Sequence, residues 1–325
     1  MIFNLELGLI EIIAMIGAGF YLLTVAADWL VTGASSLAKR IGVSSLVIGL
    51  TVVAFGTSMP ELVVSVDASL AGNPGIAVGN VVGSNIFNIA LILGIAALIQ
   101  PISCSKNVIR RDVPVMIAVA GLFWYLTQDR LISRAEAITL FCLLVIYTVY
   151  SYYKARKEPE PEPEKSADAQ DEKPTTLFAE LRLIATGFVA MIAGSKLLLQ
   201  GSIALAKAGG VSDEVIGLTL IAAGTSLPEL ATSVVAAMKG QSDIAVGNVV
   251  GSNIFNILGI LGVAGVILPL EVSEHMAKID CPLMFVISLG CLPIMRSDLK
   301  ITRLEGLVLL SAYLGYTWVL FQTPT

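Results

Sequence analysis

Long apolar runs follow one another along the chain, separated by short polar or charged stretches. A helix needs about 20 apolar residues to cross a bilayer. Runs of that order fall in ten places: residues 9–34, 43–70, 75–99, 113–127, 132–152, 178–205, 211–238, 243–267, 279–295 and 303–321. The fourth and ninth runs are shorter than the others. The pattern predicts an all-α polytopic membrane protein with ten transmembrane helices.

One polar segment divides the ten runs into two sets of five. It reads KARKEPEPEPEKSADAQDEKPTT and covers residues 154–176. A segment so rich in Pro, Glu and Lys cannot bury enough apolar surface to fold, so we expect a disordered linker. The sequence therefore predicts a first five-helix unit at 1–153 and a second at 177–325.

The two units carry the same sequence motif. Gly56–Gly94 and Gly224–Gly262 align without a gap at an offset of 168, and 27 of the 39 positions are identical. The full motifs extend over 54–94 and 222–262. Because each unit has an odd number of predicted spans, the second must enter the membrane upside down relative to the first. That is the inverted-repeat plan of many secondary transporters.

Composition and loop charge support a membrane location and fix an orientation. Of the 325 residues, 56% are hydrophobic and 14% are charged, against about 25% charged in soluble domains. With the N-terminus outside, 15 basic residues fall in cytoplasmic segments and 4 in outside segments. The positive-inside rule selects this arrangement. We expect both termini outside the cell membrane and the linker in the cytoplasm.

Other classes of function find little support in the sequence. The sequence has no basic stripe that would indicate nucleic-acid binding. The lipid bilayer is an expected partner, and no feature indicates a protein partner. The N-terminus has no Lys or Arg before its apolar run, which argues against a cleaved signal peptide. The four cysteines form no CxxC pair and His275 is the one histidine. We expect no cofactor and no enzymatic activity.

Each copy of the motif places one glutamate, Glu61 or Glu229, inside a long apolar run. An ionisable side chain at membrane depth is costly and marks a functional site. In the first copy, Gly56 and Pro60 are expected to interrupt the helix and free main-chain carbonyls near 54–57. These carbonyls join the oxygens of Thr57, Ser58 and Glu61. Such hard oxygen donors suit Ca²⁺ and Na⁺ rather than zinc or copper.

A second polar element follows each glutamate. Asn80, Ser84 and Asn88 are four residues apart and share one helix face. Gly79 and Gly83 form a GxxxG step that allows close contact with a neighbouring helix. The second copy has the same pattern, with Ala222, Thr225, Ser226, Glu229, Ser252 and Asn256. Two inverted copies would meet at the bilayer midplane in one oxygen-rich cage, whose two carboxylates balance one Ca²⁺.

The doubled signature GTSxPEL and GNVVGSNIFN resembles the α-repeats of the Ca²⁺:cation antiporter superfamily, most closely its sodium/calcium exchanger branch. The resemblance implies exchange of Ca²⁺ for Na⁺ by alternating access. It implies that Glu61 and Glu229 bind Ca²⁺ with the carbonyls of Thr57 and Thr225. It further implies Na⁺ sites shared with Ala54, Thr57 and Ser84 on one side and with Ala222, Thr225 and Ser252 on the other, flanked by Asn88 and Asn256.

The chain departs from some members of that family at one point. They carry Asp at one of the two central positions, whereas this chain has Asn88 and Asn256. The predicted site therefore holds two formal negative charges rather than three. Two other readings remain open from the residues: a Ca²⁺/H⁺ antiporter with the glutamates as proton carriers, and a cation channel with the glutamates in a selectivity ring.

Overall fold

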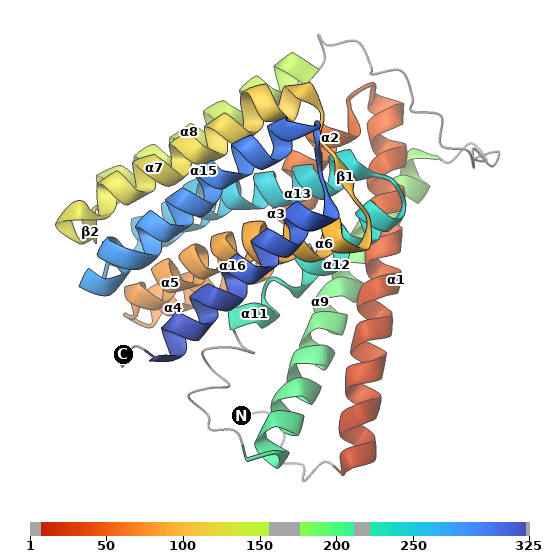
Figure 1. Cartoon of the computed structure of the whole chain (residues 1–325), viewed down its shortest axis with the longest axis horizontal. Helices are drawn as coiled ribbons and strands as arrows, with labels where there is room; N and C mark the ends of the chain where they lie inside the picture. The colour runs from red at the N-terminus through yellow and green to blue at the C-terminus, as the bar shows by residue number, and fades with distance from the viewer. Residues whose placement is uncertain (1–7, 156–175, 211–221, 323–325) are drawn as a thin grey trace.

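The computed structural model describes residues 8–155, 176–210 and 222–322. Most of the predicted linker, 156–175, and the first part of the seventh predicted span, 211–221, lie outside the described residues. Figure 1 shows an almost entirely helical molecule.

Helices make up most of the first half of the chain. Its elements are α1 (Leu9–Ile41), α2 (Ser45–Ile48), the π-helical turn η1 (Gly49–Val53), α3 (Ala54–Thr57), α4 (Met59–Leu70), α5 (Pro74–Ile86), η2 (Phe87–Ile92), α6 (Leu93–Ile99), β1 (Ile102–Ser103), η3 (Val108–Asp112), α7 (Val113–Leu126), the 3₁₀ turn η4 (Thr127–Asp129), β2 (Leu131–Ile132) and α8 (Arg134–Ala155).

The described part of the second half follows the same order, without a counterpart of η4. Its described elements are α9 (Leu177–Ala208), α11 (Ala222–Gly224), α12 (Leu227–Met238), α13 (Ser242–Phe255), η6 (Asn256–Ile260), α14 (Leu261–Ile267), β3 (Leu270–Glu271), η7 (Met276–Asp280), α15 (Cys281–Ser297), β4 (Lys300–Ile301) and α16 (Arg303–Gln322).

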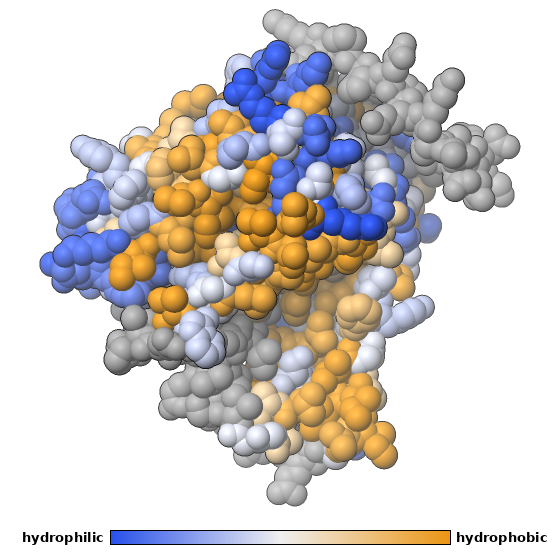
Figure 2. Space-filling model, in the orientation of Figure 1, coloured by the Kyte–Doolittle hydropathy of each residue, from blue (hydrophilic) through white to orange (hydrophobic). Residues whose placement is uncertain are grey.

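The helices are of membrane type. Among the described residues, six helical segments are long and apolar enough to cross a bilayer, and the bent pair Ser45–Thr57 and Met59–Leu70 offers one more crossing. Figure 2 shows broad apolar surface over the helices, with hydrophilic residues gathered at their ends. The all-α membrane fold predicted from the sequence is confirmed. The number of ten spans and their inverted topology stay predictions.

The fourth and ninth apolar runs underestimate their helices. In the structure helical backbone begins at Lys106 and at Glu274, several residues before each run. A π-helical turn precedes the proline in the first turn of α7 and of α15. These turns carry Arg110, Arg111 and Lys278, and such charges hide a helix from a search for apolar runs.

Two long helices, α1 and α9, form a pair that stands at an angle to the rest of the molecule (Figure 1). Their backbones approach closely at glycines. A Cβ on Gly19 would lie 2.5 Å from the amide nitrogen of Leu198, and one on Gly187 would lie 3.1 Å from that of Leu30. Because the offset of 168 relates Gly19 to Gly187 and Leu30 to Leu198, the two helices contact each other reciprocally. Small residues permit such close packing in membranes.

Two short antiparallel ladders also join the halves reciprocally. Strand β1 pairs with β4, with Ile102 opposite Ile301, and β2 pairs with β3, with Ile132 opposite Leu270. All four of these side chains are fully buried. Each ladder takes one strand from each half, so the ends of the helices are tied together across the repeat.

The close approach of α1 and α9 yields a prediction. Gly19→Ala should lower the free energy of unfolding by about 1–3 kcal/mol, because its methyl group overpacks against the backbone of α9. Gly17→Ala is the matched control: it lies in the same helix, and a Cβ there has no neighbour within 4 Å. Thermal unfolding of the purified protein in detergent measures both. Equal melting temperatures for the two variants would contradict the backbone contact.

Candidate cation-binding site

The site begins at a break in each of two helices. In the first half, α3 ends at Thr57, and Ser58 leaves helical geometry with φ −83° and ψ 8° before α4 begins at Met59. Pro60 lies in the first turn of α4, where a missing N–H costs little. In the second half, Ser226 has the same geometry, with φ −89° and ψ 8°. The predicted interruptions are present, and the serine carries the break in each.

Each break places a glutamate in the first turn of the helix that follows. Glu61 lies in the first turn of α4 and Glu229 in that of α12. The N-terminus of a helix carries partial positive charge and unpaired amides, which favour a carboxylate there. Both glutamates are completely buried.

The two carboxylates are held crosswise. Ser226 Oγ donates a hydrogen bond to Glu61 Oε1 at 2.7 Å, and Ser58 Oγ donates one to Glu229 Oε1 at 2.8 Å. The second oxygen, Oε2, of each glutamate is buried and has no hydrogen-bond partner among the described residues. Each half of the chain therefore fixes the carboxylate of the other half and leaves one of its oxygens available.

Two asparagines, Asn80 and Asn248, donate hydrogen bonds to the helices that follow the breaks. We call each set of bonds an asparagine brace. Asn80 Nδ2 donates to the carbonyl oxygen of Glu61 at 3.1 Å and to Ser65 Oγ at 3.0 Å. Asn248 makes the equivalent bonds to the carbonyl oxygen of Glu229 at 3.3 Å and to Ser233 Oγ at 3.0 Å. The sequence predicts Asn80 on the polar face, whereas Ser65 and Ser233 are not among the predicted site residues. The signal was available, because all four residues are identical between the copies.

The remaining predicted hydroxyl residues also converge on the breaks. Thr57 Oγ1 donates to Asn248 Oδ1 at 3.0 Å, which links α3 to α13. Ser226 Oγ lies 3.3 Å from Ser84 Oγ of α5. Ser252 of α13 is buried, and its Oγ has no partner among the described residues. Thr225 lies in the turn between α11 and α12 and is half-buried.

The two central asparagines are buried but differ in their contacts. Asn256 Nδ2 donates to Asn85 Oδ1 at 3.0 Å, and Asn85 Nδ2 donates to the carbonyl oxygen of Asn253 at 3.2 Å. Asn88 has no partner for either side-chain atom within the described part of the chain. The pair Asn85 and Asn253 was missed from the sequence, although it too is repeated at the offset of 168. The two halves thus hold their central amides differently in this conformation.

The main-chain carbonyls near the first break are only partly free. The Ala54 carbonyl accepts the amide of Ser58 at 3.1 Å and Thr57 Oγ1 at 3.3 Å. The sequence predicts that the proline releases this carbonyl, but in the structure α3 keeps its last hydrogen bond. In the second half, the Ser226 amide donates to the Ala223 carbonyl at 3.2 Å. Ala222 begins α11, directly after the residues that are not described.

The arrangement collects oxygen donors of the kind that hard cations prefer. Two carboxylates, several hydroxyls and several amides are enclosed between the two halves. Buried carboxylate oxygens without partners are costly unless a cation or proton compensates them. No group of three or more His, Cys, Asp or Glu side chains that could hold a metal occurs within the described ranges. Neutral oxygens would therefore have to complete the coordination of a cation. Ca²⁺ and Na⁺ accept such oxygen ligands, whereas zinc prefers nitrogen and sulfur ligands.

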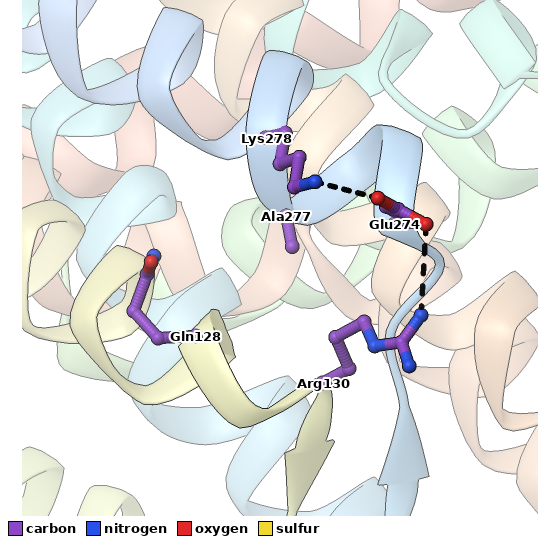
Figure 3. Close-up of a pocket in the computed structure, with 5 residues that line it drawn as sticks. All are labelled: Gln128, Arg130, Glu274, Ala277 and Lys278. Carbon is purple, nitrogen blue, oxygen red and sulfur yellow. Dashed lines mark hydrogen bonds and ion pairs between the residues drawn. The ribbon is translucent and has the colours of Figure 1, made fainter.

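A surface pocket lies elsewhere in the molecule. It is lined by Gln128, Arg130, Glu274, Ala277 and Lys278, and Figure 3 shows Glu274 reaching between the two basic side chains. Glu274 Oε1 lies 2.5 Å from Lys278 Nζ, and Glu274 Oε2 lies 3.8 Å from Arg130 Nη1. Lys278 first, and Arg130 after it, hold the pKa of Glu274 below its usual value. Its charges are thus paired with one another, unlike those of the buried glutamates.

Comparison with known proteins identifies the class. The sodium/calcium exchanger protein family model matches residues 11–153 and 180–322. The putative antiporter CaxA of Alkalimonas amylolytica is 39% identical over 94% of this chain and 97% of its own. The sodium/calcium exchanger MaX1 of Methanosarcina acetivorans is 36% identical over 93% and 96%. The solved structure of the sodium-calcium exchanger NCX_Mj, soaked with zero Na⁺ and Ca²⁺, matches with a TM-score of 0.84 at 31% identity, covering 96% of this chain and all of that one.

These matches define a multi-pass membrane protein of the cation-antiporter class, a transporter rather than an enzyme. The chain belongs to the sodium/calcium exchanger family. The resemblance drawn from the doubled motif is confirmed. The roles of individual site residues stay predictions.

The asparagine brace yields a second prediction. Asn248→Ala removes three buried hydrogen bonds. It leaves the Glu229 carbonyl and Ser233 Oγ without this donor and Thr57 Oγ1 without this acceptor. We expect it to destabilise the protein by about 1–3 kcal/mol and to speed hydrogen exchange in the first turn of α12. Ser69→Ala is the control, because the Ser69 hydroxyl is buried and makes no hydrogen bond within the described residues. Unchanged exchange in Asn248→Ala would show that the brace does not hold the break.

Proposed function

We propose that the protein exchanges Ca²⁺ for Na⁺ across the membrane by alternating access. The family match and the relatives named sodium/calcium exchangers support the ion pair. The observation that carries the proposal is the pair of fully buried glutamates, each held through Oε1 by a serine of the other half and each with Oε2 unpartnered. Two negative charges in one enclosed site match the charge of one Ca²⁺.

The coordination that we propose uses both halves equally. Glu61 and Glu229 contribute carboxylate oxygens to Ca²⁺, together with the carbonyls of Thr57 and Thr225. The same glutamates contribute to Na⁺ sites completed by Ala54, Thr57 and Ser84 on one side and by Ala222, Thr225 and Ser252 on the other. Sharing the carboxylates makes the two ions compete, and competition for one site is what couples their movements in an antiporter.

Alternating access is supported by an asymmetry between equivalent positions. Helix α1 packs along α12, whereas α9 has no comparable packing along α4 among the described residues. Thr232 of α12 is buried completely and its Oγ1 lies 3.5 Å from Met191 Sδ of α9, while its repeat equivalent Val64 of α4 is 38% exposed. One side of the site is therefore covered and the other is more open. In the orientation inferred from loop charges, the open side faces outward.

Neutralising either glutamate tests the two-carboxylate site. Glu61→Gln and Glu229→Gln should each reduce Ca²⁺ transport by at least about two orders of magnitude, because half of the charge that faces a divalent ion is removed in a poorly screened site. Glu271→Gln, at an exposed position in β3, is the control and should transport normally. Calcium uptake into proteoliposomes is the measurement. Near-normal uptake by either glutamine variant would rule out the shared site.

The central asparagines allow a sharper test of charge. In Asn256→Asp the new side chain must donate to Asn85 Oδ1 to replace the lost hydrogen bond, so it should hold a proton that is released only at higher pH. Transport by this variant should become pH-sensitive between about 5 and 8. Asn88→Asp is the matched comparison, because Asn88 makes no such bond in the described structure. Identical pH profiles for Asn256→Asp and the parent would show that residue 256 does not face the ions.

The driving ion is tested by flux. Proteoliposomes loaded with Na⁺ and diluted into Na⁺-free buffer should accumulate labelled Ca²⁺, and a pH gradient of equal size should not drive uptake. Uptake driven by the pH gradient alone would make the protein a Ca²⁺/H⁺ antiporter. Uptake that follows the Ca²⁺ gradient without any counter-ion would indicate a channel. Either result would overturn the proposal.

A further inference from the structure

The contact between α1 and the end of α12 is fastened by an ion pair. Lys239, at the C-cap of α12, places Nζ 2.5 Å from Asp28 Oδ1 and 2.8 Å from Thr32 Oγ1. Ser35 Oγ donates to Gln241 Oε1 at 3.4 Å one turn further along. Residues 28, 32 and 35 lie on one face of α1. This face of α1 is therefore held to the end of α12 on the covered side of the site. We call the contact of Asp28 and Thr32 with Lys239 the first latch.

The equivalent positions on the open side carry different residues. The offset of 168 takes Asp28 to Lys196 of α9, and it takes Lys239 to Ala71 at the end of α4. Asp67 lies one turn before Ala71, on the same face of α4. On the covered side the long helix α1 carries the aspartate and the short helix α12 carries the lysine. On the open side the long helix α9 carries the lysine and the short helix α4 carries the aspartate, so the same kind of ion pair could form with its charges reversed.

Neither partner on the open side is engaged in this conformation. Lys196 and Asp67 are exposed, and neither makes an ion pair or a side-chain hydrogen bond within the described part of the chain. Two opposite charges therefore stand unpaired on the two helices whose equivalents, α1 and α12, are fastened together.

We infer that the two pairs alternate during transport: Asp28–Lys239 closes one side, and Lys196–Asp67 closes the other. The close backbone contacts between α1 and α9 let the two helices move as one body. When that body exchanges its packing on α12 for the equivalent packing on α4, Lys196 takes the place of Asp28 and comes within reach of Asp67. These four residues thus position the access states of the proposed exchanger and do not touch the ions. The inference rests on the alternating-access part of the proposed function.

Thiol labelling tests the inference without any ion flux. Thr232→Cys reports opening on the α12 side and Val64→Cys reports opening on the α4 side, each in a Cys142→Ser background because the other three cysteines are buried. Asp28→Asn should raise labelling of Thr232→Cys by about two- to fivefold, the range expected for loss of an exposed ion pair. It should lower labelling of Val64→Cys.

The second pair should act in the opposite direction. Asp67→Asn and Lys196→Gln should each lower labelling of Thr232→Cys, because they weaken closure on the α4 side. The charge-reversed double variant Asp28→Lys with Lys239→Asp should return labelling to the parent rate. Opposite shifts from the two pairs support the inference even if Ca²⁺ and Na⁺ prove not to be the transported ions. Shifts in the same direction from both pairs, or no shift from either, would overturn it.

A cross-link provides an independent check. In the same background, a short bifunctional thiol reagent should join Lys196→Cys to Asp67→Cys. Because the cross-link closes the α4 side, it should slow the labelling of Val64→Cys. Asp28→Cys with Lys239→Cys is the positive control, because these positions are in contact in the structure. Efficient cross-linking of the control pair and none of the Lys196 and Asp67 positions, with or without Na⁺ and Ca²⁺, would contradict the second latch.

Discussion

The crosswise hydrogen bonds between two serines and two glutamates are the interaction on which the rest of the structure depends. Carboxylates within an apolar bundle are expensive, and here each one is satisfied at Oε1 by a hydroxyl from the opposite half. Those hydroxyls are in position only because each helix breaks at the serine itself, three residues before the glutamate. Neither half can build the site alone. The repeat, the breaks and the asparagine braces are parts of one requirement, which is to bring two charges together out of water.

The repeated motif, identical at 27 of 39 positions in the two halves, does not have identical surroundings in both. Thr232 is buried while its equivalent Val64 is partly exposed, and the Asn256 side chain is hydrogen-bonded while that of Asn88 makes no hydrogen bond to any described residue. On the account proposed above, an arrangement that is asymmetric in this way has a second state, in which the roles of the halves are exchanged. On the proposed account, transport is that exchange, and the ions occupy the part of the structure that stays the same in both states.

Much of this could be predicted from the sequence, because the strongest signals were local or repeated. An acidic residue beside proline inside an apolar run marks a broken helix and a site, and its recurrence at a fixed offset marks both halves. The sequence predicts that the two copies meet, but the particular side-chain contacts between the halves could not be predicted. Nothing in the sequence says that Ser226 meets Glu61, or that Ser58 keeps the Ala54 carbonyl occupied. Asn85 and Asn253 were missed because identity between copies alone does not separate a packing residue from a hydrogen-bonding one. The starts of α7 and α15 were missed because charged π-helical turns extend them.

The most direct test of the central claim is the stoichiometry of Ca²⁺ binding to the purified protein, measured by equilibrium dialysis with labelled Ca²⁺ at increasing Na⁺ concentration. If Glu61 and Glu229 form one cage, each chain should bind one Ca²⁺ in Na⁺-free buffer, and Na⁺ should displace it completely. Binding of two Ca²⁺ per chain, or of one that Na⁺ does not displace, would contradict a single shared site.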